Sequence, residues 1–277
     1  MVGKLPNSIK SKMEMTMENK LSEFEDRIVA YIDLQGFTNE VNEIGVDYDK
    51  FMRVKKILET MKKLEDKKEK NKLFGSLPDI SDSDKEILEN GFECIVVSDS
   101  IIVSYPAIPI AFNLLSIELA LMQWEILWKW NYLIRGFISR GKCFHKNGVI
   151  FGDGYLKAYL GAEKNTNHSL PYILIQDLLV TNSGSIVDIK TDLYIKDHLD
   201  RYFINYGRFI DNSPTRKNLN ASADQQAMRA MQFLHKCLEL FEKDKKIWEK
   251  YYWTFKYCCS VSSLIDQFKD KNLVYES

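Results

Sequence analysis

The sequence has almost no excess of charge of either sign. Its 277 residues include 38 Lys and Arg and 39 Asp and Glu, which gives a formal net charge of −1. Proteins dedicated to nucleic acids or anionic membranes usually carry a clear positive excess. The balance therefore argues against nucleic acid and membrane as partners and favours a small soluble ligand.

Cysteine and histidine lack the spacings of metal sites and disulfide frameworks. No Cys-x-x-Cys pair occurs, and the odd number of cysteines argues against a secreted framework, so we expect a reducing, cytoplasmic environment. The histidines show no His-x-x-x-His spacing, and we expect structural or surface roles for them. No Ser-His-Asp arrangement or Gly-x-Ser-x-Gly motif is present either. The cysteines are Cys94, Cys143, Cys237, Cys258 and Cys259, and the histidines are His145, His168, His198 and His235.

A long apolar run free of charge is also missing. The most apolar stretch, residues 107–134, contains Glu118, Glu125 and Lys129. Charged side chains at the centre of a bilayer are costly, so this stretch is predicted to be a buried helix of a soluble protein. Residues 1–26 contain no apolar segment like that of a signal peptide and are interpreted as a polar lead-in.

From residue 27 onward, short β-like runs alternate with helical patterns. An Asn-Gly pair at 147–148 and an Asp-Ser pair at 99–100 indicate two hairpins. The expected strands are 27–33, 92–98, 101–105, 132–144, 148–151, 171–175 and 200–206, and the expected helices are 38–68 (interrupted near Gly45), a short one within 75–88, 107–131, one from Gly154, and 176–181.

This order predicts an α+β fold of the ferredoxin-like, split βαβ type, with an antiparallel sheet and helices on one face. Residues 27–210 would form the domain, and residues 220–277 a helical tail with helices at 222–255 and 261–269. Apolar residues recur at helical spacing from Ala227 to Phe241, which suits packing on the domain and on a second subunit equally well.

Two aspartates are candidates for a metal site. Asp33 ends the first expected strand and Asp99 occupies the turn of a hairpin, on strands that are neighbours in this fold. Paired carboxylates repel unless a cation joins them, and Mg²⁺ prefers carboxylate and phosphate oxygens. The turn Gly36-Phe37-Thr38 leads into a helix whose free amides could hold a phosphate, with Thr38 as its cap. The alternative is that both aspartates are simply turn residues.

Three segments in this order resemble class III nucleotide cyclases. YIDLQGFTNEV (31–41) resembles the family's first strand and turn, in which Asp33 matches the first metal aspartate. VVSDSIIVSY (96–105) resembles the hairpin with the second, matched by Asp99, although Ser98 replaces the usual glycine. RGFISRGKCF and the following GVIFGDGYLKAY (within 135–159) resemble the later Arg-x-Gly-Ile-x-x-Gly strand and helix. The chain is most similar to stand-alone bacterial cyclase-like proteins, which include pyrimidine cyclases of antiphage signalling.

The resemblance implies conversion of a nucleoside triphosphate to a 3′,5′-cyclic monophosphate and pyrophosphate. Two Mg²⁺ or Mn²⁺ ions would be held by Asp33, Asp99 and the backbone carbonyl of Leu34, and amides of Gly36, Phe37 and Thr38 would surround the phosphates. Family sites form between two catalytic domains, so the resemblance also implies a head-to-tail homodimer.

Four positions depart from the family pattern. The base-selecting positions hold Ile95 and Val149, and the transition-state asparagine and arginine positions hold Leu156 and Leu160, which cannot stabilise phosphoryl charge. Purine cyclisation by the usual machinery is therefore not expected.

Nearby polar residues are candidate substitutes for the missing catalytic groups: Arg135, Arg140 and Tyr159, with Lys142 and Lys157 beside them. Arg135 and Arg140 are five positions apart on one strand, so only one of them can face the site. Tyr159 has packing as its alternative role.

Three functional hypotheses follow from the sequence. The first is a metal-dependent nucleotide cyclase. The second is a catalytically degenerate cyclase fold that binds nucleotide as a regulatory or scaffold module. The third and weakest is nucleotide polymerisation by a related palm-type fold.

Overall fold

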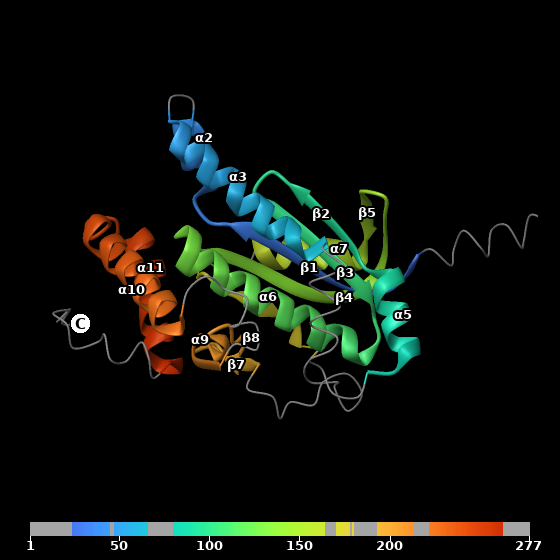
Figure 1. Ribbon diagram of the computed structural model, residues 1–277. Helices are drawn as coiled ribbons and strands as arrows, with labels where there is room; N and C mark the ends of the chain where they lie inside the picture. Colours follow the sequence, from blue (N-terminus) through green and yellow to red (C-terminus); the bar gives the residue numbers. More distant parts are fainter. Residues whose placement is uncertain are drawn as a thin grey trace, which may run out of the picture.

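The computed structural model describes residues 24–44, 47–65, 80–163, 170–177, 179, 193–212 and 222–262. Within them the strands form one eight-stranded sheet in the order β2-β3-β1-β4-β6-β8-β7, with β5 paired to β4 (Figure 1). The strands are β1 (Glu25–Leu34), β2 (Glu93–Val97), β3 (Ser100–Pro106), β4 (Ile134–Lys146), β5 (Val149–Gly152), β6 (Ile173–Ile175), β7 (Tyr194–Lys196) and β8 (Tyr202–Ile204).

The helices lie between and after these strands. They are α2 (Phe37–Ile44), α3 (Tyr48–Lys62), the 3₁₀ turn η1 (Lys63–Glu65), α5 (Asp82–Gly91), α6 (Pro109–Trp130), α7 (Asp153–Glu163), α9 (Arg208–Asn212), α10 (Ala223–Leu240) and α11 (Lys245–Val261). Four of them begin at a side-chain cap: Asp47 caps α3, Ser81 caps α5, Ser222 forms a capping box with Gln225 at α10, and Asp244 caps α11.

The α+β class is confirmed, and β2-β3-β1-β4 have the strand order of a split βαβ core. All three pairings within this core are antiparallel. Helices α3 and α6, the two crossover helices, pack on one face through residues such as Val54, Ile57 and Leu119, against Ile28 and Ile32 of β1. This part of the fold follows directly from the order of apolar periodicities.

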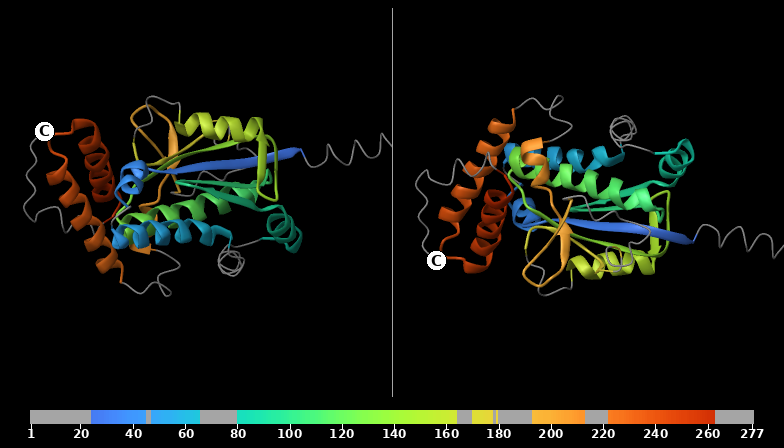
Figure 2. Two further views of the ribbon diagram at one scale, coloured as in Figure 1. Left: turned by 90° about the horizontal axis from the view of Figure 1, so that it is seen from above. Right: turned by 90° about the horizontal axis from the view of Figure 1, so that it is seen from below.

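The expectation of helices on one face only is wrong for α7. Figure 2 shows α7 on the side of the sheet opposite α3 and α6. There Ala158 and Ala162 pack with Val29 and Tyr31 of β1 in a second cluster. Strand β1 is buried at every position from Arg27 to Leu34, so both of its faces need a cover.

The sheet is also mixed rather than wholly antiparallel. Strand β6 runs parallel to β4, with Gly136 opposite Ile173. Parallel neighbours need a crossover connection, and α7 lies within the connection between these two strands. The strand β7 was not predicted from the sequence.

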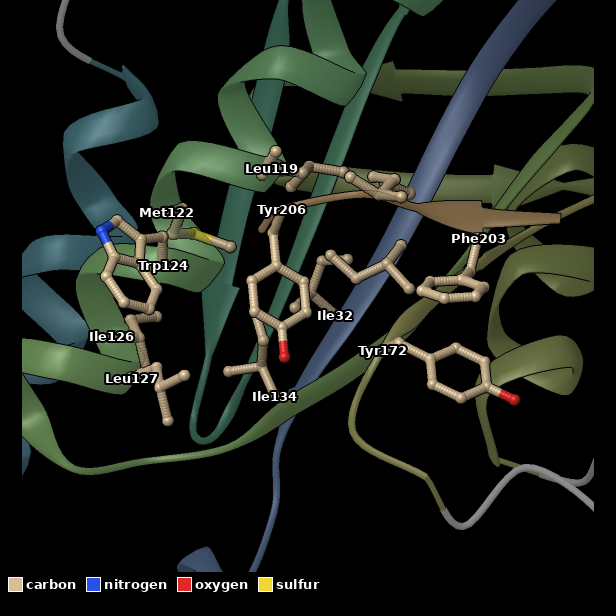
Figure 3. Packing of buried hydrophobic residues seen from close by; sticks show 14 of the residues in the cluster. Ile32, Leu119, Met122, Trp124, Ile126, Leu127, Ile134, Tyr172, Phe203 and Tyr206 are labelled. Carbon is tan, nitrogen blue, oxygen red and sulfur yellow. The ribbon is translucent and has the colours of Figure 1, made fainter. Parts of the chain in front are cut away.

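The main core lies between the sheet and α6. Figure 3 shows Ile32 of β1 and Ile134 of β4 beside Tyr206, with α6 side chains such as Trp124 and Leu127 next to them. Among the described helices, α6 is the one long and apolar enough to span a membrane, and 72% of its most apolar window is buried inside the protein. It is therefore a buried core helix, as predicted.

The C-terminal helices belong to this same core. Trp124 Nε1 of α6 donates a hydrogen bond of 3.0 Å to Gln226 Oε1 of α10. Tyr257 of α11 donates to Asn205 Oδ1 at 2.6 Å and accepts from the Gly207 N–H at 2.8 Å. The single helix expected at 222–255 is two helices, because the chain turns after Leu240 and α11 restarts with a side-chain cap.

Several predicted features lie outside the described residues. They are residues 1–23 of the lead-in, Gly45, the loop before residue 80, part of the helix at 176–181, and the helical piece at 261–269 beyond residue 262. Asp244 is the residue that caps α11.

Candidate functional site

The end of β1 and the β2–β3 turn meet at one edge of the sheet. The Leu34 N–H donates a hydrogen bond of 3.0 Å to the carbonyl oxygen of Asp99. Asp33 lies opposite Ser100 in the β1–β3 register. Ser98, in the turn, has a φ of 55°, a left-handed conformation that the family's glycine would adopt more easily. The backbone thus brings Asp33 and Asp99 to the same edge, as their positions in the sequence suggested.

Asp33 is part of an ion-pair chain that includes a residue not singled out from the sequence. Arg135 lies opposite Asp33 on β4, and its Nε donates to Asp33 Oδ2 at 3.0 Å. A second guanidinium nitrogen of Arg135 donates to Glu163 Oε2, also at 3.0 Å. One arginine therefore bridges two carboxylates that come from the first strand and the end of α7.

Asp33 is a buried carboxylate whose negative charge is only partly compensated by nearby positive charge. The residue is 8% exposed. Burial raises its pKa to about 6, Arg135 opposes that rise, and the nearby charges of Glu163 and Asp99 add to it. Tyr31, below it on the same strand, also has a pKa raised by burial, to about 12, and its hydroxyl contacts Ser100 Oγ at 2.8 Å.

The donor set fits a hard divalent cation. No described residue hydrogen-bonds to Asp33 Oδ1, so this oxygen is available to a cation. The backbone of Asp99 is bonded to Leu34, the next residue, and the charge of Asp99 acts on Asp33. A buried carboxylate with a raised pKa is stabilised by a cation. No group of three His, Cys, Asp or Glu among the described residues is arranged to hold an ion. Mg²⁺ or Mn²⁺ would therefore complete its shell with water and substrate phosphate, as Mg²⁺ commonly does.

The turn from β1 into α2 contains a glycine in a left-handed conformation, and the helix start differs from expectation. Gly36 has a φ of +83°, is exposed, and has open space around the position of a Cβ. The Phe37 side chain is buried in the main core and anchors the turn, and as the first residue of α2 its backbone amide has no acceptor within the helix. Helix α2 begins at Phe37, so Thr38 is its second residue rather than its cap.

Two of the candidate substitutes lie away from this cluster or pack within the fold. Arg140 binds Asp26 Oδ2 through Nε at 2.8 Å, near the opposite end of β1. Tyr159 packs edge-on against Tyr31, with ring centroids 5.4 Å apart, which matches its alternative role in packing. Lys157 pairs with Asp153 on its own helix. Of the predicted catalytic side chains, the structure brings only Arg135 to Asp33.

The four departures from the family pattern are apolar surface or partly buried side chains. Val149 is 53% exposed and Leu156 52% exposed, while Ile95 and Leu160 are partly buried. None of them offers a hydrogen bond to a base or a charge to a phosphate.

Glu163 and Lys250 are the residues near Asp33 that sequence reasoning missed. Glu163 ends α7, and nothing in its local pattern marks it. Lys250 of α11 interacts electrostatically with both Asp33 and Arg135, although more than 200 residues of chain separate it from Asp33. Only tertiary packing brings these groups together.

A search of protein-family models found no match to the chain, and a search of curated proteins found none either. The fold defines an α+β protein with a split βαβ core, and the resemblance to class III cyclases stays a prediction from the sequence motifs.

Proposed function

We propose that this protein is a metal-dependent nucleotide cyclase that acts at the edge formed by Asp33 and Asp99. In the reaction, the 3′-oxygen of a nucleoside triphosphate attacks its own α-phosphorus, the bond to the β-phosphate oxygen breaks, and pyrophosphate leaves. The hydroxyl proton is released to water. The observation that carries the proposal is the joining of the two aspartate segments by the Leu34–Asp99 backbone hydrogen bond of 3.0 Å on a split βαβ sheet.

The residues of the chain have separate roles in this proposal. Asp33, Asp99 and the Leu34 carbonyl would hold Mg²⁺ or Mn²⁺, which lowers the charge on the phosphates and activates the attacking hydroxyl. The amides of Gly36, Phe37 and Thr38 would accept a phosphate at the N-terminus of α2. Arg135 orients Asp33 through its hydrogen bond of 3.0 Å.

The biological setting of the proposal comes from the resemblance alone. It comprises a cytoplasmic enzyme, a pyrimidine nucleotide as substrate, a role in bacterial antiphage signalling, and a homodimer. The apolar side chains Ile95 and Val149 at the base-selecting positions are compatible with a base other than a purine.

A second candidate function is a nucleotide-binding regulatory module without turnover. Two observations favour it. Arg135 already occupies one oxygen of Asp33, and Leu156 and Leu160 stand where the family has its transition-state groups. Such a protein would bind the triphosphate and leave it intact.

Incubation of the purified protein with each of the four common nucleoside triphosphates and Mg²⁺ or Mn²⁺ separates the two functions. A cyclase releases pyrophosphate and a cyclic monophosphate from at least one of them. Asp33→Asn and Asp99→Asn should abolish this product. Asp200→Asn is the matched control, because Asp200 is exposed and its φ of 62° suits asparagine. Nucleotide binding without any cyclic product would refute the cyclase and support the regulatory module.

A further inference from the structure

A cavity of about 1070 Å³ lies where α10 and α11 meet the C-terminal end of α6 and the β1–α2 turn. Gln35 and Gly36 of that turn line the cavity, two and three residues beyond Asp33. Figures 1 and 2 show α10 and α11 at the same end of the molecule as the start of α2. The volume of the cavity lies just above the usual range for small-molecule sites, roughly 300–1,000 Å³, and is ample for a nucleotide.

The charge of the cavity is strongly positive, although the chain as a whole is near neutral. Asp244 is the only acidic residue among the described residues that line it. The cationic residues that line it are Arg53, Lys129, Arg229, Lys236, Lys246 and Lys250. These like charges repel one another. A bound anion would be attracted by each of them and would reduce the repulsion among them.

Most of these cations have no carboxylate partner in the described part of the chain. Lys129 has one, since its Nζ lies 2.9 Å from Glu125 Oε1. No ion pair joins Arg229, Lys236, Lys246 or Lys250 to any described acid, in contrast to Lys245, Lys157 and Lys196, which pair with neighbours on their own segments.

A buried donor without a partner gives an independent sign of a ligand. Trp128 lines the cavity, is 4% exposed, and its indole N–H finds no acceptor among the described residues. A buried N–H that lacks an acceptor is costly, and a bound anionic oxygen would remove that cost. The guanidinium of Arg229 lies over the same ring, 5.9 Å from its centroid.

Aromatic rings add flat apolar surface to the cavity, next to the six cations that line it, which we call the cationic wall. Phe241 and Tyr251 are stacked with centroids 5.6 Å apart and an interplanar angle of 4°. The guanidinium of Arg53 lies 5.4 Å from the ring centroid of Tyr132. All four residues line the cavity. This combination suits a nucleotide, because cations bind its anionic phosphates and aromatic rings stack with its base.

Lys250 connects the cavity to the aspartate edge. It lines the cavity, and its electrostatic neighbours are Arg135, Lys246, Asp33 and Asp244. Lys250 therefore belongs to the cavity and also interacts electrostatically with Asp33.

We propose that this cavity binds the phosphates of the nucleotide substrate, and that α10 and α11 supply the binding cations in the same chain as Asp33 and Asp99. The choice of a nucleotide among polyanions rests on the proposed function. The C-terminal helices are then a substrate-binding part of the site rather than an appended tail, and phosphate binding does not require a second subunit.

The test is equilibrium binding by calorimetry in the presence of a chelator, with inorganic tripolyphosphate and each of the four nucleoside triphosphates as probes. The double variant Lys236→Gln/Lys246→Gln removes two exposed cavity cations and should weaken binding by about tenfold or more. The control is Lys243→Gln/Lys256→Gln, which removes equal charge from exposed positions of the same region that do not line the cavity. Its affinity should stay within about twofold of the wild type, because screened charges outside a site contribute little.

Two results would overturn the inference: equal weakening by both double variants, or no binding of any probe by the wild-type protein in chelator. Urea denaturation of each variant shows whether the fold is kept, and because all four positions are exposed we expect unchanged midpoints.

Product formation keeps this inference apart from the proposed function. Binding that is weakened by Lys236→Gln/Lys246→Gln, without product from any nucleotide, contradicts the cyclase and leaves the cavity assignment standing. A wild-type enzyme that forms a cyclic product, with an unchanged KM in that double variant, contradicts the cavity assignment and leaves the cyclase standing.

Discussion

Arg135 Nε donates a 3.0 Å hydrogen bond to Asp33 Oδ2 across the β1–β4 pairing. This contact decides how much negative charge the aspartate edge presents. Arg135 lowers the pKa of Asp33, while burial and the charges of Glu163 and Asp99 raise it, and the result is a pKa of about 6. The arginine thus keeps a buried carboxylate ionised at neutral pH, in the state that a cation or a phosphate-bound metal requires.

Replacement of Arg135 by glutamine should move the pKa of Asp33 upward from about 6, because the opposing cation is lost while burial and the neighbouring carboxylates remain. Carbon-13 NMR titration of the Asp33 carboxyl measures this directly. The same change should lower the free energy of unfolding by about 1–3 kcal/mol, since a charged hydrogen-bond pair is broken.

Arg140→Gln is the matched control for that titration, since Arg140 pairs with Asp26 and lies away from Asp33. An unchanged Asp33 pKa in Arg135→Gln, or an equal rise in both variants, would contradict the assigned role of Arg135.

Acid should destabilise the protein through His145. This residue is 4% exposed, its Nδ1 lies 2.7 Å from Ser104 Oγ, and burial, with the nearby charge of Arg27, lowers its pKa to about 4. A folded-state pKa below the unfolded value gives stability that is present above about pH 6.5 and is lost as the pH falls towards 4. Urea unfolding across this window should show a loss of about 2–3 kcal/mol from this group.

His145→Asn should flatten the acid limb of that stability profile, whereas His198→Asn, at an exposed position, should leave it unchanged. Stability profiles with the same slope between pH 6.5 and 4 in the wild type and in His145→Asn would contradict the lowered pKa of His145 in the folded state.

Leu234→Ala should destabilise the whole domain and not only its C-terminal helices. Leu234 is fully buried on α10 within the main core. The lost burial and the cavity left behind should cost about 2–5 kcal/mol. Circular dichroism and tryptophan fluorescence followed together in urea should report one shared transition.

Leu240→Ala, at the exposed end of the same helix, should change stability by less than about 0.5 kcal/mol. Two separate transitions in Leu234→Ala would mean that α10 and α11 form an independent unit.

Gly136→Ala should disturb the sheet directly beside Asp33 and Arg135. A Cβ at Gly136 would lie 2.6 Å from the backbone oxygen of Tyr31 and 2.5 Å from Ile32 Cδ1, and the backbone atom cannot rotate away. Such overpacking costs about 1–3 kcal/mol, measured by urea or thermal unfolding.

Gly148→Asn tests that this cost comes from crowding. Gly148 has a φ of +76° and open space around it, so asparagine, which tolerates this conformation, should have a small effect. Comparable losses at both positions would argue against the close approach of β4 to β1.

Much of the split βαβ core could be predicted from the sequence, because local signals specify it. The apolar run at 27–33, the Asp-Ser turn and the Asn-Gly turn each belong to neighbouring residues, and their order fixes which strands pair. The meeting of Asp33 and Asp99 follows from the same pattern. The sequence also indicated that the second face of β1 is covered, because residues 28–32 are apolar without a break and β1 is buried on both faces. The expectation of helices on one face only overlooked this, and α7 covers the second face.

The cationic wall could not be predicted, because it is assembled from distant segments. Arg53, Lys236 and Lys250 lie on α3, α10 and α11, and each follows an ordinary amphipathic pattern in its own helix. Their convergence depends on how α10 and α11 dock, and the side chains that hold them, Trp124 with Gln226 and Tyr257 with Asn205, leave no mark in local periodicity.

The shared use of Asp33 and Asp99 by one cation is tested most directly by electron paramagnetic resonance of Mn²⁺. Titration of Mn²⁺ and a nucleoside triphosphate into the wild-type protein should deplete the free-ion signal beyond the depletion by nucleotide alone. Asp33→Asn and Asp99→Asn should each lose this extra depletion, while Asp200→Asn should keep it. Equal depletion by the wild type and both site variants would contradict a metal-dependent site at this edge of the sheet.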